Sequence, residues 1–333
     1  MHIVSTILVI GLVAAGWAGQ SKAEVREVVI ALQPGLAYSA QMIMKDQGYV
    51  EANLAASGLT STKVTYRTFG SGGAMNDAVL SGAAHFGASG VPAFITLWSR
   101  ALGTKSESKG CIALDSEPTV ALTRDSRIKT LRDIGEGDKI SVPAVKVSIQ
   151  AVLLQMAAAK MYGDSQYNQL DKHTVSLSHP DGLSVVLSGA EVGTVVAAIP
   201  YIDLGMQKGL RPIFHSYDVV DRNATTVLLW SGRKFQEENP ATFNAVMEAF
   251  GRASSLIKSN PRLAAEIYLR VGKEKFTTEF IEKHYTDPAI SFAPQPVGVQ
   301  TFVDFMHRVG TVKQVGVKWE DLFFDGCKKY WGR

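Results

Sequence analysis

Short runs of β-branched residues alternate with longer segments of helical spacing through most of this chain. The first runs, at residues 28–32, 63–69 and 85–90, are separated by helical spacing at residues 39–53 and 74–81. Strand, helix, strand is the pattern of parallel βαβ units. The sequence therefore predicts an α/β protein in which mainly parallel sheets are flanked by helices. Further strands are expected at residues 138–142, 174–177, 194–199 and 211–216.

Two extended segments interrupt this alternation, at residues 111–124 and 225–230. The first is long enough to pass from one lobe into another, and a chain of 333 residues is expected to form two lobes or domains. We therefore expect a discontinuous first lobe, an inserted second lobe, and a ligand cleft between them. The first lobe would comprise residues 24–117 and 219–333, and the second residues 118–218.

An apolar run at residues 3–15 begins the chain and is too short to span a bilayer comfortably. Ser21, Lys22 and Ala23 place small residues at the minus-three and minus-one positions of a cleavage site. We therefore expect residues 1–23 to be a signal peptide and the protein to be periplasmic, without a lipid anchor because no Cys lies near the cleavage site. The n-region carries His2 but no Lys or Arg, and a single membrane anchor is the alternative.

The charge of the chain excludes some partners. It has 34 Lys and Arg residues against 31 Asp and Glu, a formal net charge of +3, and no run of basic residues concentrates that charge. We expect no nucleic-acid partner. The two cysteines, Cys111 and Cys327, could pair in an oxidising compartment or remain free thiols, and the sequence favours neither alternative.

Signatures of common enzymes are missing from the sequence. There is no Gly-x-Ser-x-Gly elbow, His-Glu-x-x-His helix, Cys-x-x-Cys pair or phosphate-binding loop ending in Gly-Lys-Ser/Thr. His179-Pro180-Asp181 pairs an imidazole with a carboxylate, but Asp181 is expected to cap the next helix. We therefore expect no catalytic residue, cofactor or metal site.

Small, polar or glycine-containing turns follow the predicted parallel strands. Ligands of open α/β sheets lie beyond these strand ends, where helix N-termini present free N–H groups and partial positive charge. Turns from two lobes can face each other across a cleft and hold a small anion with amide and hydroxyl donors. The five turns lie at residues 33–36, 70–72, 89–92, 144–148 and 199–201.

Five segments carry a resemblance to a known family. They are residues 30–35 (IALQPG), 69–82 (FGSGGA followed by DAVLSG), 125–134 (DSRIKTLRDI), 143–150 (PAVKVSIQ) and 319–324 (WEDLFF). Together they resemble the periplasmic substrate-binding proteins of ABC importers in the nitrate, sulfonate/taurine and bicarbonate group. The fold of that group is shared with the thiamine-pyrimidine synthases.

This resemblance implies a two-lobed periplasmic binding protein fold of type II that closes like a hinge on a small anion of the sulfonate, nitrate or organic carboxylate type. It implies delivery to an ABC permease and its ATPase in the inner membrane, and a monomeric protein. An enzyme on the same fold and a sensor without transport are the alternatives. The expected ligand-binding residues are Gly35, Leu36, Ser71, Gly72, Gly90, Val91, Pro92, Val147, Ser148, Ile149, Pro200 and Tyr201.

Overall fold

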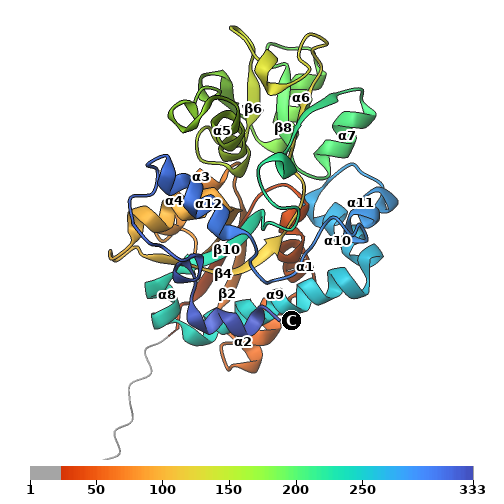
Figure 1. The fold of residues 1–333 in the computed structure, drawn as a ribbon. Coiled ribbons are helices and arrows are strands. Elements are labelled where there is room, and N and C mark those ends of the chain that lie inside the picture. The colour runs from red at the N-terminus through yellow and green to blue at the C-terminus, as the bar shows by residue number, and fades with distance from the viewer. Residues whose placement is uncertain (1–23, 333) are drawn as a thin grey trace, which may run out of the picture.

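The computed structural model describes residues 24–332, so the predicted signal peptide lies outside the described part of the chain. Figure 1 shows two lobes, and each is built on one five-stranded sheet. The strands of the first lobe come from both ends of the described chain, whereas those of the second come from its middle. The α/β class and the two-lobed architecture expected from the sequence are confirmed.

The sheet of the first lobe has the order β2-β1-β3-β10-β4. Strand β1 runs parallel to β2 and β3, and β10 runs antiparallel to β3 and β4. Strand β10 is antiparallel because it enters this lobe from the second lobe. The strands are β1 (Glu27–Leu32), β2 (Lys63–Thr68), β3 (Phe86–Gly90), β4 (Ser108–Asp115) and β10 (Val227–Gly232).

The sheet of the second lobe repeats this plan in the order β7-β6-β8-β5-β9. Strand β6 is parallel to β7 and β8, and β5 is antiparallel to β8 and β9. Here β5 is the strand that enters from the other lobe. The strands are β5 (Val120–Thr123), β6 (Ile140–Val142), β7 (Thr174–Ser176), β8 (Thr194–Ala197) and β9 (Arg211–His215).

Helices flank both sheets, and two local expectations need correction. The segment at residues 39–53 is not one helix, because Gly48 adopts φ 62° and separates α1 from α2. Ser178, not Asp181, caps α6, since the Ser178 hydroxyl accepts from the Asp181 N–H. The helices are α1 (Ser39–Gln47), α2 (Tyr49–Ala56), α3 (Gly72–Leu80), α4 (Val91–Ala101), α5 (Ile149–Tyr162), α6 (His179–Leu187), α7 (Tyr201–Gln207), α8 (Arg233–Glu238), α9 (Pro240–Ser259), α10 (Pro261–Gly272), α11 (Thr278–Tyr285) and α12 (Val299–Arg308).

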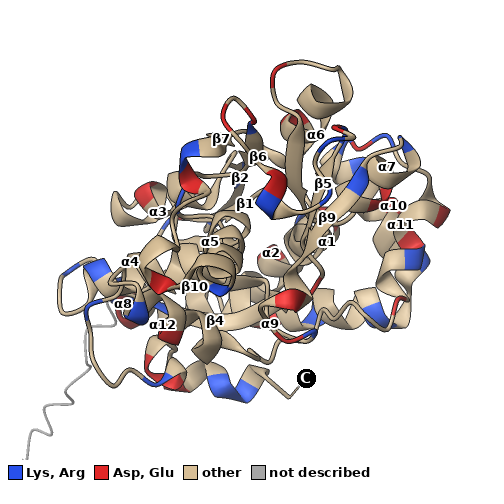
Figure 2. Ribbon diagram, turned by 45° about the horizontal axis from the view of Figure 1, so that its top comes forward, with Lys and Arg blue, Asp and Glu red and all other residues tan. Residues whose placement is uncertain are grey.

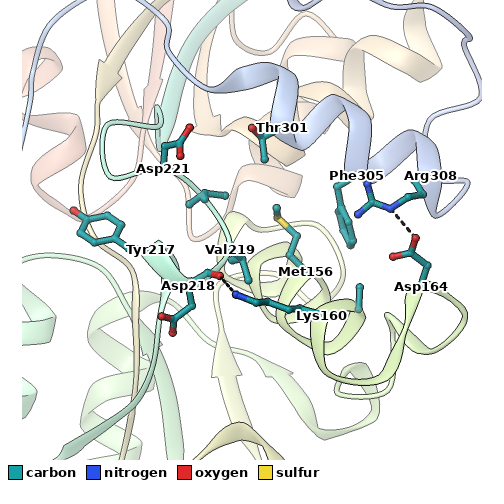
Figure 3. A pocket seen from close by; sticks show the side chains of 12 residues that line it. Met156, Lys160, Asp164, Tyr217, Asp218, Val219, Asp221, Thr301, Phe305 and Arg308 are labelled. Atoms are coloured by element: carbon teal, nitrogen blue, oxygen red, sulfur yellow. Dashed lines mark hydrogen bonds and ion pairs between the residues drawn. The ribbon is translucent and has the colours of Figure 1, made fainter.

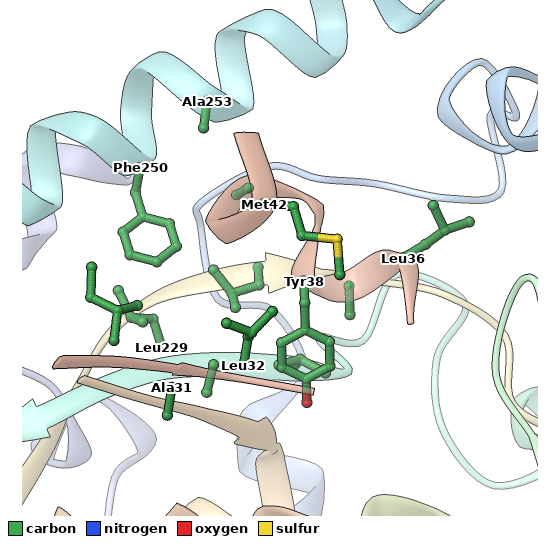
Figure 4. Close-up of a cluster of buried hydrophobic side chains, with 14 of the residues drawn as sticks. Ala31, Leu32, Leu36, Tyr38, Met42, Leu229, Phe250 and Ala253 are labelled. Carbon is green, nitrogen blue, oxygen red and sulfur yellow. The ribbon is translucent and has the colours of Figure 1, made fainter. Parts of the chain in front are cut away.

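The core of the first lobe lies on both faces of its sheet. Alternate residues of β10 point to opposite faces, so Val227 and Leu229 join one hydrophobic cluster while Leu228 and Trp230 join the other. Figure 4 shows the first cluster between β1, β10, α1 and α9. Its labelled residues are Ala31, Leu32, Leu36, Tyr38, Met42, Leu229, Phe250 and Ala253.

Two crossing segments connect the lobes, at residues 116–119 and 216–226. They are bonded to each other, because Ser216 N–H donates to the Thr119 carbonyl (2.8 Å) and Thr226 N–H to that of Asp115 (3.0 Å). Ser116 also pairs with Ser291, which belongs to a strap of residues 288–298 before α12. The chain therefore passes between the lobes through segments that are hydrogen-bonded to each other.

Cys111 lies on β4, and Cys327 lies in a short helical segment, Asp325–Tyr330, that packs against this strand. Both are free and fully buried. Burial raises the pKa of the Cys111 thiol, and the neighbouring Cys327 raises it further. Of the two alternatives left by the sequence, the structure has the free thiols.

Charged residues of both signs are interspersed over the outer helices and loops of both lobes (Figure 2). Among residues 24–332, no helix combines the length and apolar character needed to cross a membrane.

Candidate functional site

A small cavity lies between the two lobes, at the strand ends where the sequence placed the ligand turns. The first lobe contributes residues that follow β1 and β3, and the second contributes those that follow β6 and β8. Its volume of about 40 Å³ leaves room for only a few water-sized groups. The lining residues are Gln33, Pro34, Gly35, Ala37, Tyr38, Gly72, Gly90, Ala93, Glu117, Pro143, Ser148, Ile149, Gln150, His179, Ala198, Thr226 and Val227.

The helices that begin at this cavity include α3 and α4 from the first lobe and α5 and α6 from the second. Ser148 caps α5, since its hydroxyl accepts from the Ala151 N–H (3.3 Å), and only 7% of Ser148 is exposed. The first N–H groups of such helices are without intrahelical partners and carry partial positive charge. The cavity therefore has an electropositive rim made of backbone.

Two glycines allow the walls of the cavity to approach closely. A Cβ on Gly72 would lie 2.8 Å from the Cβ of Ser89, and one on Gly90 would lie 2.9 Å from that of Ile149. The second contact is between lobes, because Gly90 precedes α4 and Ile149 begins α5. Gly90 is thus one of the points at which the two lobes touch.

The structure brings five of the twelve expected ligand residues together at the cavity. Seven others are placed elsewhere, among them Leu36 and Val91, which lie in the two hydrophobic clusters. Those that line the cavity are Gly35, Gly72, Gly90, Ser148 and Ile149. Those that do not line it are Leu36, Ser71, Val91, Pro92, Val147, Pro200 and Tyr201.

Ser71 and Tyr201 show why only some residues of a predicted turn reach the cavity. The Ser71 hydroxyl accepts from Ala74 N–H (3.3 Å) as the cap of α3, and the next residue, Gly72, is the one that reaches the cavity. Tyr201 is buried, and its hydroxyl donates to Oε1 of Glu274 (3.1 Å), which lies two residues beyond the end of α10. Its ring stacks on the imidazole of His179 (5.9 Å between centroids), which does line the cavity.

An acidic pair formed by the last residue of β4, Asp115, and by Glu117 on the first crossing segment also belongs to the site. Glu117 lines the cavity and is 6% exposed, and Asp115 behind it is 1% exposed. Thr226 fixes the backbone of Glu117, since its hydroxyl accepts from the Glu117 N–H (3.0 Å) and donates to the Glu117 carbonyl (3.2 Å). One oxygen of Asp115 accepts from Val227 N–H (2.9 Å).

The two carboxyl groups hydrogen-bond to each other. Beyond that contact, Glu117 Oε2 and Asp115 Oδ2 are buried and accept no hydrogen bond from a donor in the described chain. Burial raises the pKa of Asp115 to about 7. Burial also raises the pKa of Glu117, and the adjacent charge of Asp115 raises it further. The two carboxyl groups consequently keep protons at pH values at which ordinary surface carboxylates have already lost theirs.

Other polar groups complete the lining. Gln33 donates from Nε2 to the Tyr38 hydroxyl, and burial raises the pKa of Tyr38. Burial lowers the pKa of His179 to about 4, so its imidazole is neutral near pH 7. Sequence reasoning missed Glu117, Tyr38 and His179 as cavity residues. Gln33 lay within the predicted turn at residues 33–36 but was not among the expected ligand-binding residues.

A larger hollow on the outside of the molecule is shown in Figure 3. This outer groove, of about 480 Å³, is lined by α5, α12 and residues 217–221. Its two cationic side chains already have partners: Lys160 Nζ donates to the Asp218 carbonyl (2.7 Å), and Arg308 Nε pairs with Asp164 Oδ2 (2.7 Å). It receives none of the predicted strand-end turns. We therefore take the cavity between the lobes as the candidate site.

No cluster of three or more His, Cys, Asp or Glu residues in the described chain could hold a metal ion. The cavity is instead built from helix N-termini, neutral polar groups and one acidic pair. Two lobes, each with an antiparallel strand entering from the other lobe, enclose it. These features define the fold of the two-lobed periplasmic binding proteins.

Comparison with solved structures finds this fold in proteins of that class. The nitrate-binding protein NrtA from Synechocystis PCC 6803 has a TM-score of 0.71 at 10% identity, covering 92% of this chain and 88% of its own. The alkanesulfonate-binding protein SsuA from Xanthomonas axonopodis pv. citri, bound to MOPS, has a TM-score of 0.67 at 16% identity, covering 88% and 96%. The aliphatic sulphonate-binding SsuA from Escherichia coli has a TM-score of 0.61 at 18% identity, covering 91% and 100%.

No protein-family model matches the chain, and no curated protein matches it. Because these solved structures share only 10%, 16% and 18% identity with this chain, their likeness to it establishes the fold alone. The resemblance to the nitrate and sulfonate group drawn from the sequence is therefore confirmed at the level of the fold.

Proposed function

We propose that this protein is the solute-binding component of an ABC import system. It captures a small anionic solute in the cavity between its lobes and delivers it to a permease and its ATPase in the inner membrane. Residues 24–117 with 219–333 form one lobe, residues 118–218 form the other, and the crossing segments act as the hinge. The protein works as an exported periplasmic monomer and not as an enzyme.

The observation that carries this proposal is the convergence of helix N-termini from both lobes, those of α3, α4, α5 and α6, on one cavity. Backbone N–H groups at such termini favour a negative group, and no Lys or Arg among the described residues lines the cavity. The neighbours described as nitrate-binding and sulfonate-binding support the same class of function.

The small size of the cavity supports the hinge. With about 40 Å³ available and Gly90 against Ile149, a solute of several heavy atoms cannot pass between the lobes as they lie here. Entry and release therefore require the lobes to separate about residues 116–119 and 216–226. Such hinge motion is absorbed by a few residues at element ends.

Two capping serines provide a matched test. Ser148→Leu and Ser71→Leu each remove a helix cap, a loss of about 1 kcal/mol, but only Ser148 lines the cavity. A thermal-shift panel of nitrate, short sulfonates and short carboxylates is measured on the wild-type protein and both variants. We expect Ser148→Leu to abolish the shift given by the best solute and Ser71→Leu to retain it. Equal loss in both variants, or retention in both, contradicts the site.

A further inference from the structure

The segment at residues 322–331 covers the outer edge of the first-lobe sheet, where β4 ends the strand order. Phe324 N–H donates to the Gly110 carbonyl of β4 (3.0 Å), and Trp331 Nε1–H donates to the Cys111 carbonyl (2.9 Å). These two contacts come from either side of Cys327 in the sequence. They therefore hold the backbone around Cys327 against the strand that carries Cys111.

The two thiols meet inside this contact. Both cysteines are fully buried in the same hydrophobic cluster, and the Cys327 thiol is a hydrogen-bond partner of the Cys111 thiol. The Cys327 backbone is itself fixed, since its N–H donates to the Phe324 carbonyl (3.0 Å). The sequence has two cysteines in 333 residues, so each thiol has a single partner available within the chain.

Resting on the export to the periplasm that is part of the proposed function, we propose that Cys111 and Cys327 are joined there by a disulfide. Exchange with an oxidised dithiol protein supplies the chemistry. One cysteine thiolate attacks the disulfide of the oxidant and releases one of its sulfurs, and the other cysteine thiolate then attacks the mixed disulfide and releases the second. The two cysteines lose two protons and two electrons, and the oxidant gains them as it becomes a dithiol.

Burial sets when this bond forms. Because burial raises the pKa of the Cys111 thiol, the folded protein holds little thiolate, and exchange takes place before the C-terminal segment docks. The bond then closes a loop of residues 111–327, which contains the whole second lobe. A constraint across so long a loop removes freedom from the unfolded chain. Since β4 runs directly into the crossing segment at residues 116–119, the disulfide also anchors the hinge at its first-lobe end.

Mapping the thiols of the exported protein tests the proposal. The full chain is expressed for export, quenched with acid, and alkylated in denaturant with and without prior reduction. We expect no alkylation without reduction, and mass spectrometry should find a proteolytic peptide pair that links Cys111 to Cys327. Cys327→Ala is the matched control, in which Cys111 should be alkylated without reduction. Two alkylated cysteines in the unreduced wild-type protein, or disulfides between chains, overturn the proposal.

Cell fractionation and melting keep this result separate from the proposed function. Free thiols in a chain recovered from the periplasm overturn the disulfide alone, whereas a chain that is not exported overturns the location on which both proposals rest. The oxidised protein should melt about 5 °C above the reduced protein, and equal melting would contradict the staple. Neither cysteine lines the cavity, so reduction should leave the thermal shift given by the best solute of the panel in place.

Discussion

Glu117 shows how one residue on a crossing segment gives the cavity an acidic group. Its carboxyl group and that of Asp115 have pKa values raised by burial. A carboxyl whose pKa is higher in the folded protein stabilises the fold below its unfolded pKa, near 4, and that stability is lost as pH rises through the folded pKa. For Asp115, that window runs from about pH 4 to about pH 7.

Glu117→Gln should flatten this pH dependence. The Gln amide can donate to Asp115 Oδ2 without titrating, so it removes the need for a shared proton. Urea unfolding at pH 5, 6.5 and 8 should show the variant gaining on the wild-type protein as pH rises, by about 1–3 kcal/mol across the range. Parallel pH profiles for the two proteins would contradict the assignment of a buried acidic pair.

At the scale of elements, the approach of α4 and α5 sets how far the lobes can close. Gly90→Ala keeps an allowed backbone, since φ is −52°, but its Cβ would lie 2.9 Å from that of Ile149 in the other lobe. Overpacking of this kind costs about 1–3 kcal/mol. We expect about tenfold weaker binding of the best solute by calorimetry, because the closed state is penalised.

Gly73→Ala is the control for this element. Its added Cβ would meet only the Ser71 hydroxyl, at 3.8 Å, and Gly73 does not line the cavity. Its affinity should stay near that of the wild-type protein. If Gly90→Ala binds as tightly as Gly73→Ala, the two lobes do not meet at Gly90 in the bound state.

The elements also show what the sequence could predict. Helix α5 was predictable because its signals are local: a Ser148 cap, an apolar spacing and Gly163 at its end. The positions of the turns at the strand ends were predictable from the sequence, but the direction in which each side chain of a turn points was not. Leu36 lies in the core although Gly35 beside it lines the cavity. Glu117 was missed because an extended crossing segment has no periodicity, and its neighbour Thr226 is distant in sequence.

At the scale of the whole molecule, contacts between the lobes extend beyond the cavity. Asp203 on α7 accepts from His284 Nε2 (2.8 Å) and pairs with Lys283 Nζ (2.8 Å), both on α11 of the first lobe. The hydrogen bond from His284 is the main reason that the pKa of Asp203 falls to about 2. This contact is lost only as pH falls from about 4 towards 2, so it is available to the closed arrangement of the lobes throughout the neutral range.

The central claim is that one solute is enclosed by both lobes, and hydrogen–deuterium exchange tests it most directly. The best-binding probe of the panel should slow amide exchange in both lobes at once, at the beginnings of α4 and α5 and in residues 116–119 and 225–227. Protection confined to one lobe, or centred on the outer groove at residues 156–164, 217–221 and 301–308, would contradict the account.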